Sequence, residues 1–233
     1  MVETTGIAPA LPAAAVADAA VRLGRGVRPA PIELRRLASG LPVTGPARPV
    51  RHAGSVDVFF EALERAEPGE VLVIDNAGRR DEGCIGDLSG LEIRDAGIAG
   101  VVVWGLHRDS RELVEIGLPV WSLGTNPAGP AGARPREPDA LQRARVGDAW
   151  VELGDTVVAD DDGVLFVAAA DWWEIAAAAR LIVEVERRQA DLARGGQRLR
   201  DQYDFAAYLA RRAADPSYTF RDHLRTRGAA IEE

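Results

Sequence analysis

The order of apolar and polar positions along the chain predicts alternating helices and strands. The alanine-rich segment AAAVADAAVRLG has the spacing of a short helix that ends at Gly24. A Pro-rich stretch through VTGPARPV is predicted to be extended or looped, and residues 1 to about 50 are expected to pack on the core. VDVFFEALERA then has helical spacing, and VLVIDN is typical of a buried strand.

The alternation continues through the middle of the chain. We expect a helix near 87–97, a strand at 99–104, a helix at 109–117 and a strand at LPVWSL, which is the order of βαβ units. Three strand-like segments follow a Gly/Pro/Ala-rich loop, and ADDDG at 159–163 is expected to be a hairpin turn because it lacks the length of a calcium loop. A long helix and two short helices separated at Pro216 are expected at the end.

Length and composition limit the classes of protein that fit. The chain has 233 residues, 47% of them apolar, which favours one main domain with appendages. A net charge of −8 argues against a broad nucleic-acid-binding surface. Cys84 is the only cysteine, so no internal disulfide can form, and this fits a reducing cytoplasm. No apolar run reaches the length of a membrane span, so no membrane contact is expected.

The basic residues are all arginine, and the absence of lysine carries chemical information. Schiff-base chemistry, pyridoxal phosphate attachment and Walker-type phosphate loops all need a lysine amine, so these classes are excluded. No two of the three histidines have the spacing of a helical metal pair, which argues against a common zinc site. Carboxylates are plentiful, and they suit Mg²⁺ or Mn²⁺.

Two stretches are expected to meet in space. CIGDLSG places Asp87 at the start of a helix, and HRDSREL places Arg108 and Asp109 after the next strand. The helix travels roughly 16 Å at about 1.5 Å per residue, and the strand returns by roughly 20 Å. Both stretches should therefore lie at one edge of the sheet, beyond the carboxyl ends of the strands, where ligands usually bind.

The residue types at this edge suggest an anion site beside a metal. Backbone N–H groups of a first helical turn are unpaired and favour an anion. Here that turn comprises Gly86, Asp87, Leu88 and Ser89. Arg108 adds a planar cationic donor, while Asp109, with Asp87 acting through bound waters, offers oxygen to a divalent cation. Together they would accommodate a small 2-oxo acid.

Simpler interpretations remain open at this point. Asp87 and Asp109 both fit the start of a helix as caps, and Arg108 alone would more often be a surface residue. His107 is interpreted as a bystander. Cys84 is interpreted as a small packing residue, because no histidine partner for a reactive thiol is identifiable.

The segment GCIGDLSGLEIRDAGIAGVVVWGLHRDSRELVEIGLPVWSLG resembles the centre of a known superfamily. That superfamily includes the regulator of ribonuclease E activity A and the 4-hydroxy-4-methyl-2-oxoglutarate aldolases. The aldolase branch has an acidic residue, twenty intervening residues and then Arg-Asp, which here are Asp87, Arg108 and Asp109. LGDTVVADDDGVLFVA is similar to a second block of the family and VADAAVRLG to its N-terminal helix, so the resemblance spans about residues 12–193.

The resemblance implies an α/β/β/α swivelling-domain sandwich over residues 1–193, with 194–233 as an added C-terminal helical extension. It also implies homotrimers or homohexamers, and a metal-dependent aldolase that releases pyruvate from 4-hydroxy-2-oxo acids, often with oxaloacetate decarboxylation. Gly86, Asp87, Leu88 and Ser89 would then bind the pyruvyl part, Arg108 would contact the keto oxygen and Asp109 would lie at Mg²⁺ or Mn²⁺. A water held by Asp87 is the candidate for proton transfer.

Two departures from the aldolase pattern bear on the substrate. Trp104 stands where the aldolases commonly have aspartate, and His107 replaces a small or apolar residue. A different oxo-acid substrate is therefore one alternative. Another is a non-catalytic regulator, because some relatives act by binding a ribonuclease and lack the full set of acid, arginine and aspartate.

Overall fold

The computed structural model describes residues 10–226, which form two compact units. The first unit comprises Gly26–Trp172 together with the described residues up to Ala14, and the second comprises Ala15–Arg25 together with the chain from Trp173 onward. Residues 1–9 of the predicted N-terminal segment and 227–233 of the predicted tail lie outside the described residues. The predicted domain boundary at residue 193 stays a prediction.

The first unit is built on an eight-stranded sheet with the order β1-β12-β11-β3-β4-β6-β8-β2. Its central strands β3, β4, β6 and β8 are parallel, and the strands at either end join antiparallel. The predicted turn at 159–163 is confirmed as the link between β11 and β12. The strands are β1 (Arg28–Pro29), β2 (Arg35–Arg36), β3 (Val43–Arg51), β4 (Val71–Asp75), β6 (Gly100–Trp104), β8 (Val120–Ser122), β11 (Thr156–Ala159) and β12 (Val164–Val167).

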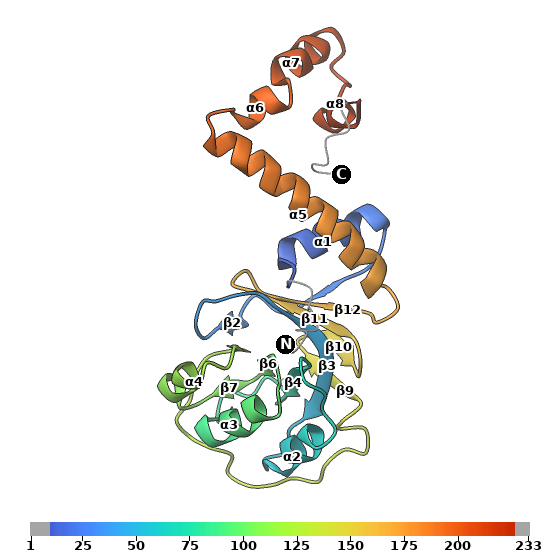
Figure 1. The fold of residues 1–233 in the computed structure, drawn as a ribbon. Coiled ribbons are helices and arrows are strands. Elements are labelled where there is room, and N and C mark those ends of the chain that lie inside the picture. Colours follow the sequence, from blue (N-terminus) through green and yellow to red (C-terminus); the bar gives the residue numbers. More distant parts are fainter. Residues whose placement is uncertain (1–9, 227–233) are drawn as a thin grey trace, which may run out of the picture. The chain divides into compact units, whose positions relative to one another are not determined.

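Each face of the sheet carries its own apolar cluster. Leu72 and Ile74 of β4 pack with residues of helices α2 (Asp57–Leu63) and α3 (Asp87–Asp95). Val71 and Val73 point to the other face, where the hairpin of β9 (Arg143–Val146) and β10 (Ala149–Glu152) closes the second cluster. Helices α2, α3 and α4 (Ser110–Ile116) lie on one side of the sheet in Figure 1. The predicted α/β fold of the RraA-like type, with added C-terminal helices, is confirmed.

The Pro-rich stretch VTGPARPV, which was predicted only to be extended or looped, forms most of strand β3. The first half of β3 pairs with β11 up to Pro46, and its second half pairs with β4 from Ala47 onward. Each half therefore has a free side in the sheet ladder. A proline whose missing N–H faces that free side removes no hydrogen bond, so the strand tolerates Pro46 and Pro49.

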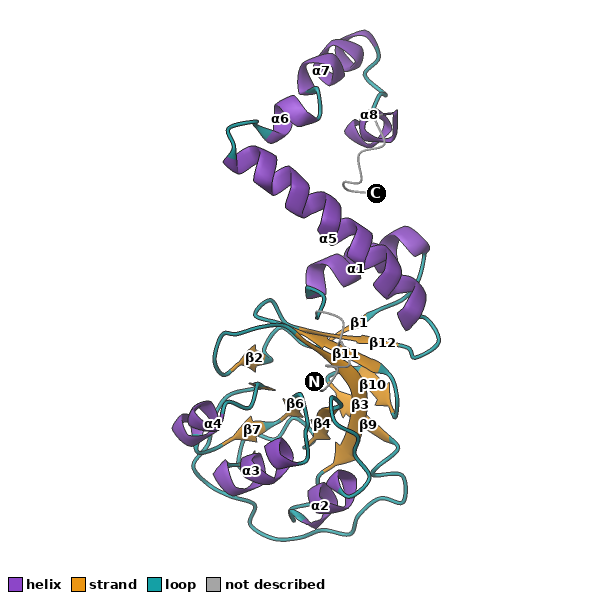
Figure 2. Cartoon of the chain, viewed as in Figure 1, coloured by secondary structure: helices purple, strands orange, loops and turns teal. Residues whose placement is uncertain are grey.

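The second unit is helical, as Figure 2 shows. Within the described residues, the two short helices expected after the long helix are present, and a third precedes them. The extra one, α6, is a single turn, too short to leave an apolar period in the sequence. The break at Pro216 is correct, since it falls between α7 and α8. The helices are α1 (Ala13–Leu23), α5 (Trp172–Arg194), α6 (Leu199–Gln202), α7 (Phe205–Ala214) and α8 (Phe220–Thr226). The first residues of α1 and of α5 are assigned to the first unit.

Aromatic rings hold the end of the tail together. Tyr208 lies 5.0 Å from Phe220 and 5.3 Å from Phe205 between ring centroids, and His223 stacks on Phe220. His223 Nε2 also bonds to the carbonyl of Tyr203 at 2.8 Å. None of the described helices is long and apolar enough to cross a membrane.

Candidate functional site

Two short parallel strands bring the sequence-predicted site residues to one place. β5 (Gly83–Ile85) runs into α3, and β7 (Leu106–His107) runs towards α4. The backbone N–H of Arg108 donates to the carbonyl of Ile85 over 2.9 Å. The convergence expected from helix and strand lengths is therefore present, because the pairing fixes both junctions side by side.

The contact between the junctions is close. The N–H of Asp87 donates to Asp109 Oδ2 over 3.2 Å, and Arg108 Nε lies 3.4 Å from the same oxygen. A Cβ at Gly86 would clash with Asp109 Oδ2 and would lie 3.1 Å from Arg108 Nε. Only glycine at position 86 allows the arginine and the aspartate to approach the start of α3 this closely.

The helix-cap alternative does not describe Asp109. It is the N-cap residue of α4, yet its side chain makes no capping hydrogen bond. It instead reaches across the chain to the amide of Asp87. Its backbone is left-handed, with φ 54° and ψ 44°, an uncommon conformation that aspartate tolerates better than most residues. The side chain of Asp109 thus points to the start of α3, while its backbone adopts a conformation that is unfavourable for most residues.

The first turn of α3 differs from the expectation. Its amides were expected to be unpaired, but the N–H of Gly86 donates to Ser89 Oγ over 3.0 Å and that of Leu88 to Asp87 Oδ1 over 2.7 Å. With the bond from Asp87 to Asp109, the protein's own oxygens occupy these donors. An incoming carboxylate would have to displace the side chains of Asp87 and Asp109 from these amides.

A cleft of about 520 Å³ opens beside this turn. Each predicted substrate-binding residue lines this cleft. Asp109 lies next to Gly86 but is not among the described lining residues. Arg108 contributes a cation to the lining, and Asp87 and Glu92 contribute carboxylates. The lining residues are His52, Gly54, Ser55, Val56, Phe60, Gly83, Cys84, Ile85, Gly86, Asp87, Leu88, Ser89, Leu91, Glu92, Arg108 and Pro130.

Sequence reasoning missed a buried polar group next to the cleft. His52 Nδ1 lies 3.0 Å from Asn76 Oδ1 and 3.9 Å from Glu82 Oε1, and its ring stacks on Phe59 at 5.2 Å. Burial lowers the pKa of His52 below its usual value. Glu82 is paired with Arg79 at 3.1 Å. The signal for this group was present, since His52 follows β3 and Asn76 follows β4 at the carboxyl edge of the sheet.

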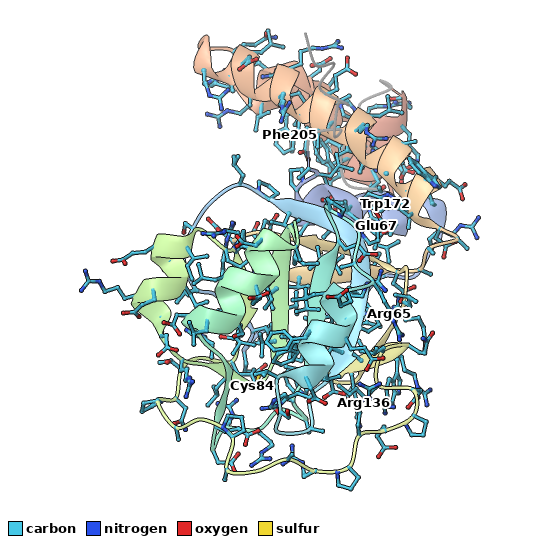
Figure 3. The ribbon with its side chains drawn as sticks, turned by 60° about the horizontal axis from the view of Figure 1, so that its bottom comes forward. Arg65, Glu67, Cys84, Arg136, Trp172 and Phe205 are labelled. Atoms are coloured by element: carbon cyan, nitrogen blue, oxygen red, sulfur yellow. The ribbon has the colours of Figure 1, made fainter. Side chains whose placement is uncertain are left out.

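Three other residues singled out in the sequence have structural roles. His107 is buried between the hydroxyls of Ser122 and Ser110, at 2.8 and 2.9 Å, and burial lowers its pKa. Cys84, labelled in Figure 3, is buried, and burial raises the pKa of its thiol to about 12. Trp104 packs near Gly78 and lies outside the described lining of the cleft.

The donor set fits a hard divalent cation better than zinc. Within residues 10–226, no three histidine, cysteine or acidic side chains gather as a metal cluster. Asp87 and Asp109 each carry a carboxylate, and the backbone amide of Asp87 donates to Asp109 Oδ2 over 3.2 Å. Mg²⁺ keeps several waters and is commonly bound through one or two carboxylates together with substrate oxygens. These residues therefore fit Mg²⁺ or Mn²⁺.

Known proteins share this fold and sequence pattern. The family model RraA-like: Aldolase/RraA matches residues 13–166. An uncharacterized protein from Pseudomonas syringae pv. tomato str. DC3000 matches with a TM-score of 0.71 and 24% identity, covering 81% of this chain and 90% of its own. RraAS2 of Streptomyces coelicolor, described as an unusual member of the RNase ES inhibitor RraA protein family, matches with a TM-score of 0.63 and 30% identity, covering 78% and 90%. The RNA-processing inhibitor RraA from Thermus thermophilis matches with a TM-score of 0.57 and 25% identity, covering 65% and 91%.

Proposed function

The chain belongs to the RraA-like family, and we propose that it is a divalent-metal-dependent aldolase that cleaves a 4-hydroxy-2-oxo acid and releases pyruvate. Decarboxylation of oxaloacetate at the same site is part of this proposal, because both reactions leave the enolate of pyruvate. One observation supports it most: Asp109 Oδ2 meets both the amide of Asp87 and the guanidinium of Arg108, two residues that line the cleft.

Each residue has a separate task in this proposal. Arg108 lines the cleft and stabilises the negative charge that develops on the keto oxygen as the C3–C4 bond breaks. Its guanidinium stays protonated, so it does not accept the proton. Asp87 lines the same cleft and is the carboxylate that holds the water for proton transfer. Gly86, Leu88 and Ser89 form the wall against which the pyruvyl part lies.

Asp109 would hold the metal, with Asp87 contributing through water. When bound, Mg²⁺ or Mn²⁺ supplies a Lewis acid that withdraws electrons from the substrate's keto group. The lysine-free composition supports this choice, because an aldolase without lysine has no Schiff base to serve as the electron sink.

The deciding experiment measures pyruvate release from oxaloacetate and from a 4-hydroxy-2-oxo diacid, first with Mg²⁺ and then with excess chelator. Equal rates under both conditions would reject the metal. Arg108→Ala should lose about 100- to 1,000-fold in turnover, since one lost donor to a developing oxyanion costs about 3–4 kcal/mol. Arg111→Ala, on the exposed side of α4 with its partner Glu115, is the matched control and should keep normal turnover.

The second candidate is a non-catalytic regulator that binds a ribonuclease. It is favoured by the descriptions of RraAS2 and the Thermus protein as inhibitors. Co-purification of a stable ribonuclease, without bound metal and without pyruvate formation, would support it over the aldolase.

We further propose a homotrimer or homohexamer that works in the cytoplasm, in which neighbouring subunits border the cleft. Light scattering of the full chain tests the assembly, and a monomeric mass would reject it.

A further inference from the structure

The loop that follows β8 packs against the side chain of Arg108. This loop runs along the edge of the first unit below α3 and α2 (Figures 1 and 3). A Cβ at Gly129 in the loop would lie 2.7 Å from Arg108 Nη1, which is closer than a real Cβ approaches another atom. On the other side, a Cβ at Gly86 would lie 3.1 Å from Arg108 Nε. The arginine thus lies between two backbone segments that have no side chains.

The loop is fixed by backbone bonds on both sides of Gly129. The N–H of Gly83 in β5 donates to the carbonyl of Ala128 over 2.7 Å, and the N–H of Asn126 donates to the carbonyl of His107 over 2.9 Å. Further along, the N–H of Arg134 donates to the carbonyl of Ala53 over 2.7 Å. Because these hydrogen bonds lie on both sides of Gly129, the loop backbone cannot easily move away from Arg108.

We propose that Gly129 is a positioning residue, which holds the Arg108 guanidinium in the orientation that meets the substrate's keto oxygen. This inference rests on the proposed function for its chemical consequence. Its structural content is independent: a methyl group at position 129 must move the guanidinium, because the end of a flexible side chain yields before an anchored backbone does. A displacement of about 1 Å at a reacting group can cost about 100-fold in rate.

The matched control lies in the same loop. A Cβ at Gly132 would meet no described atom within 4 Å. Gly132→Ala therefore makes the same chemical change three residues away without touching Arg108. Differences between Gly129→Ala and Gly132→Ala report the contact with the guanidinium and not the altered backbone entropy of the loop, which the two variants share.

The test combines pyruvate binding, turnover and structure. With Mg²⁺ present, Gly129→Ala should weaken pyruvate binding, measured by calorimetry, and lower kcat/KM by about 10- to 100-fold, mostly in kcat. Gly132→Ala should change either by less than about twofold. In an Arg108→Lys background, where Nη1 is missing, Gly129→Ala should also change binding by less than about twofold. Equal losses in both backgrounds, or unchanged binding in Gly129→Ala, would overturn the proposal.

The two proposals can fail separately. If the wild-type chain neither binds pyruvate nor releases it, the proposed function fails. A crystal structure of Gly129→Ala then decides the positioning role, which is supported by a displaced Arg108 guanidinium and refuted by an unmoved one.

Discussion

The substitution Gly90→Ala is predicted to destabilise the wild-type chain but to stabilise a chain in which Leu113, the residue that faces Gly90, is replaced by alanine. Gly90 lies buried in the interior of α3, and a Cβ there would be 2.7 Å from Leu113 Cδ2 in α4. Leu113 is fully buried, so its side chain has little room to yield. We call this contact the packing seam: it joins α3, which begins at Asp87, to α4, whose N-cap residue is Asp109.

Two opposing terms set the magnitude. Replacing a glycine inside a helix with alanine gains about 1 kcal/mol from helix propensity. Forcing a methyl into a filled core costs about 1–3 kcal/mol. Gly90→Ala should therefore lower the free energy of unfolding of the wild-type chain by up to about 2 kcal/mol. Leu113→Ala alone costs about 2–5 kcal/mol, but it removes the atom that clashes. In that background Gly90→Ala should instead raise the free energy of unfolding by about 1 kcal/mol.

Urea unfolding followed by circular dichroism measures all four proteins of this cycle. The coupling energy, which is the difference between the two effects of Gly90→Ala, should be about 1–3 kcal/mol. If Gly90→Ala stabilises the wild-type chain as much as it stabilises Leu113→Ala, the two helices are not in the contact described, and the reasoning from the 2.7 Å approach is refuted.

Three further predictions concern buried groups. Cys84, with a pKa of about 12, should react with a thiol reagent at pH 8 about 10³- to 10⁴-fold more slowly in the folded chain than in urea, and fast labelling of the folded chain would contradict its burial. The pKa values of His52 and His107 are lowered by burial, so the unfolded chain binds more protons below pH 6.5, and stability should fall as the pH drops below that value. His52→Gln should flatten this dependence, and an unchanged slope would contradict the assignment. Glu70→Ala should cost about 3–5 kcal/mol in thermal or urea unfolding, because it leaves the mostly buried Arg48 without its partner at 2.7 Å, whereas a cost below 1 kcal/mol would show the pair to be solvated.

The sequence was sufficient where a local pattern decides the structure. The helices at α1, α3 and α5 and the strands β4 and β6 follow from apolar periodicity, because burial of one face determines each of them. Strand β3 and the single-turn helix α6 were not predicted as such. The role of the prolines in β3 depends on which neighbour each half of the strand meets, and that information lies in residues more than twenty positions away.

The candidate site was predictable in outline but not in its hydrogen bonds. Similar lengths of helix and strand were enough to bring Asp87 and Arg108 to one edge. The sequence could not show that the carboxylate of Asp109 takes the amide of Asp87, because that bond needs the left-handed backbone at Asp109. The sequence also could not show that Gly129 lies beside Arg108, because a loop has no apolar periodicity from which its course could be predicted.

The packing seam and the site are mechanically linked by their spacing along the helices. Gly90 lies one turn after Asp87 in α3, and Leu113 lies one turn after Asp109 in α4, with the N–H of Leu113 bonded to the carbonyl of Asp109 over 2.9 Å. A change that separates the helices at this contact is therefore expected to lengthen the 3.2 Å bond between the amide of Asp87 and Asp109 Oδ2. Side-chain packing between α3 and α4 thus bears on the position of Asp109 relative to the start of α3. The bond joins the start of α3 to the residue that precedes α4, so its length depends on how closely the two helices pack.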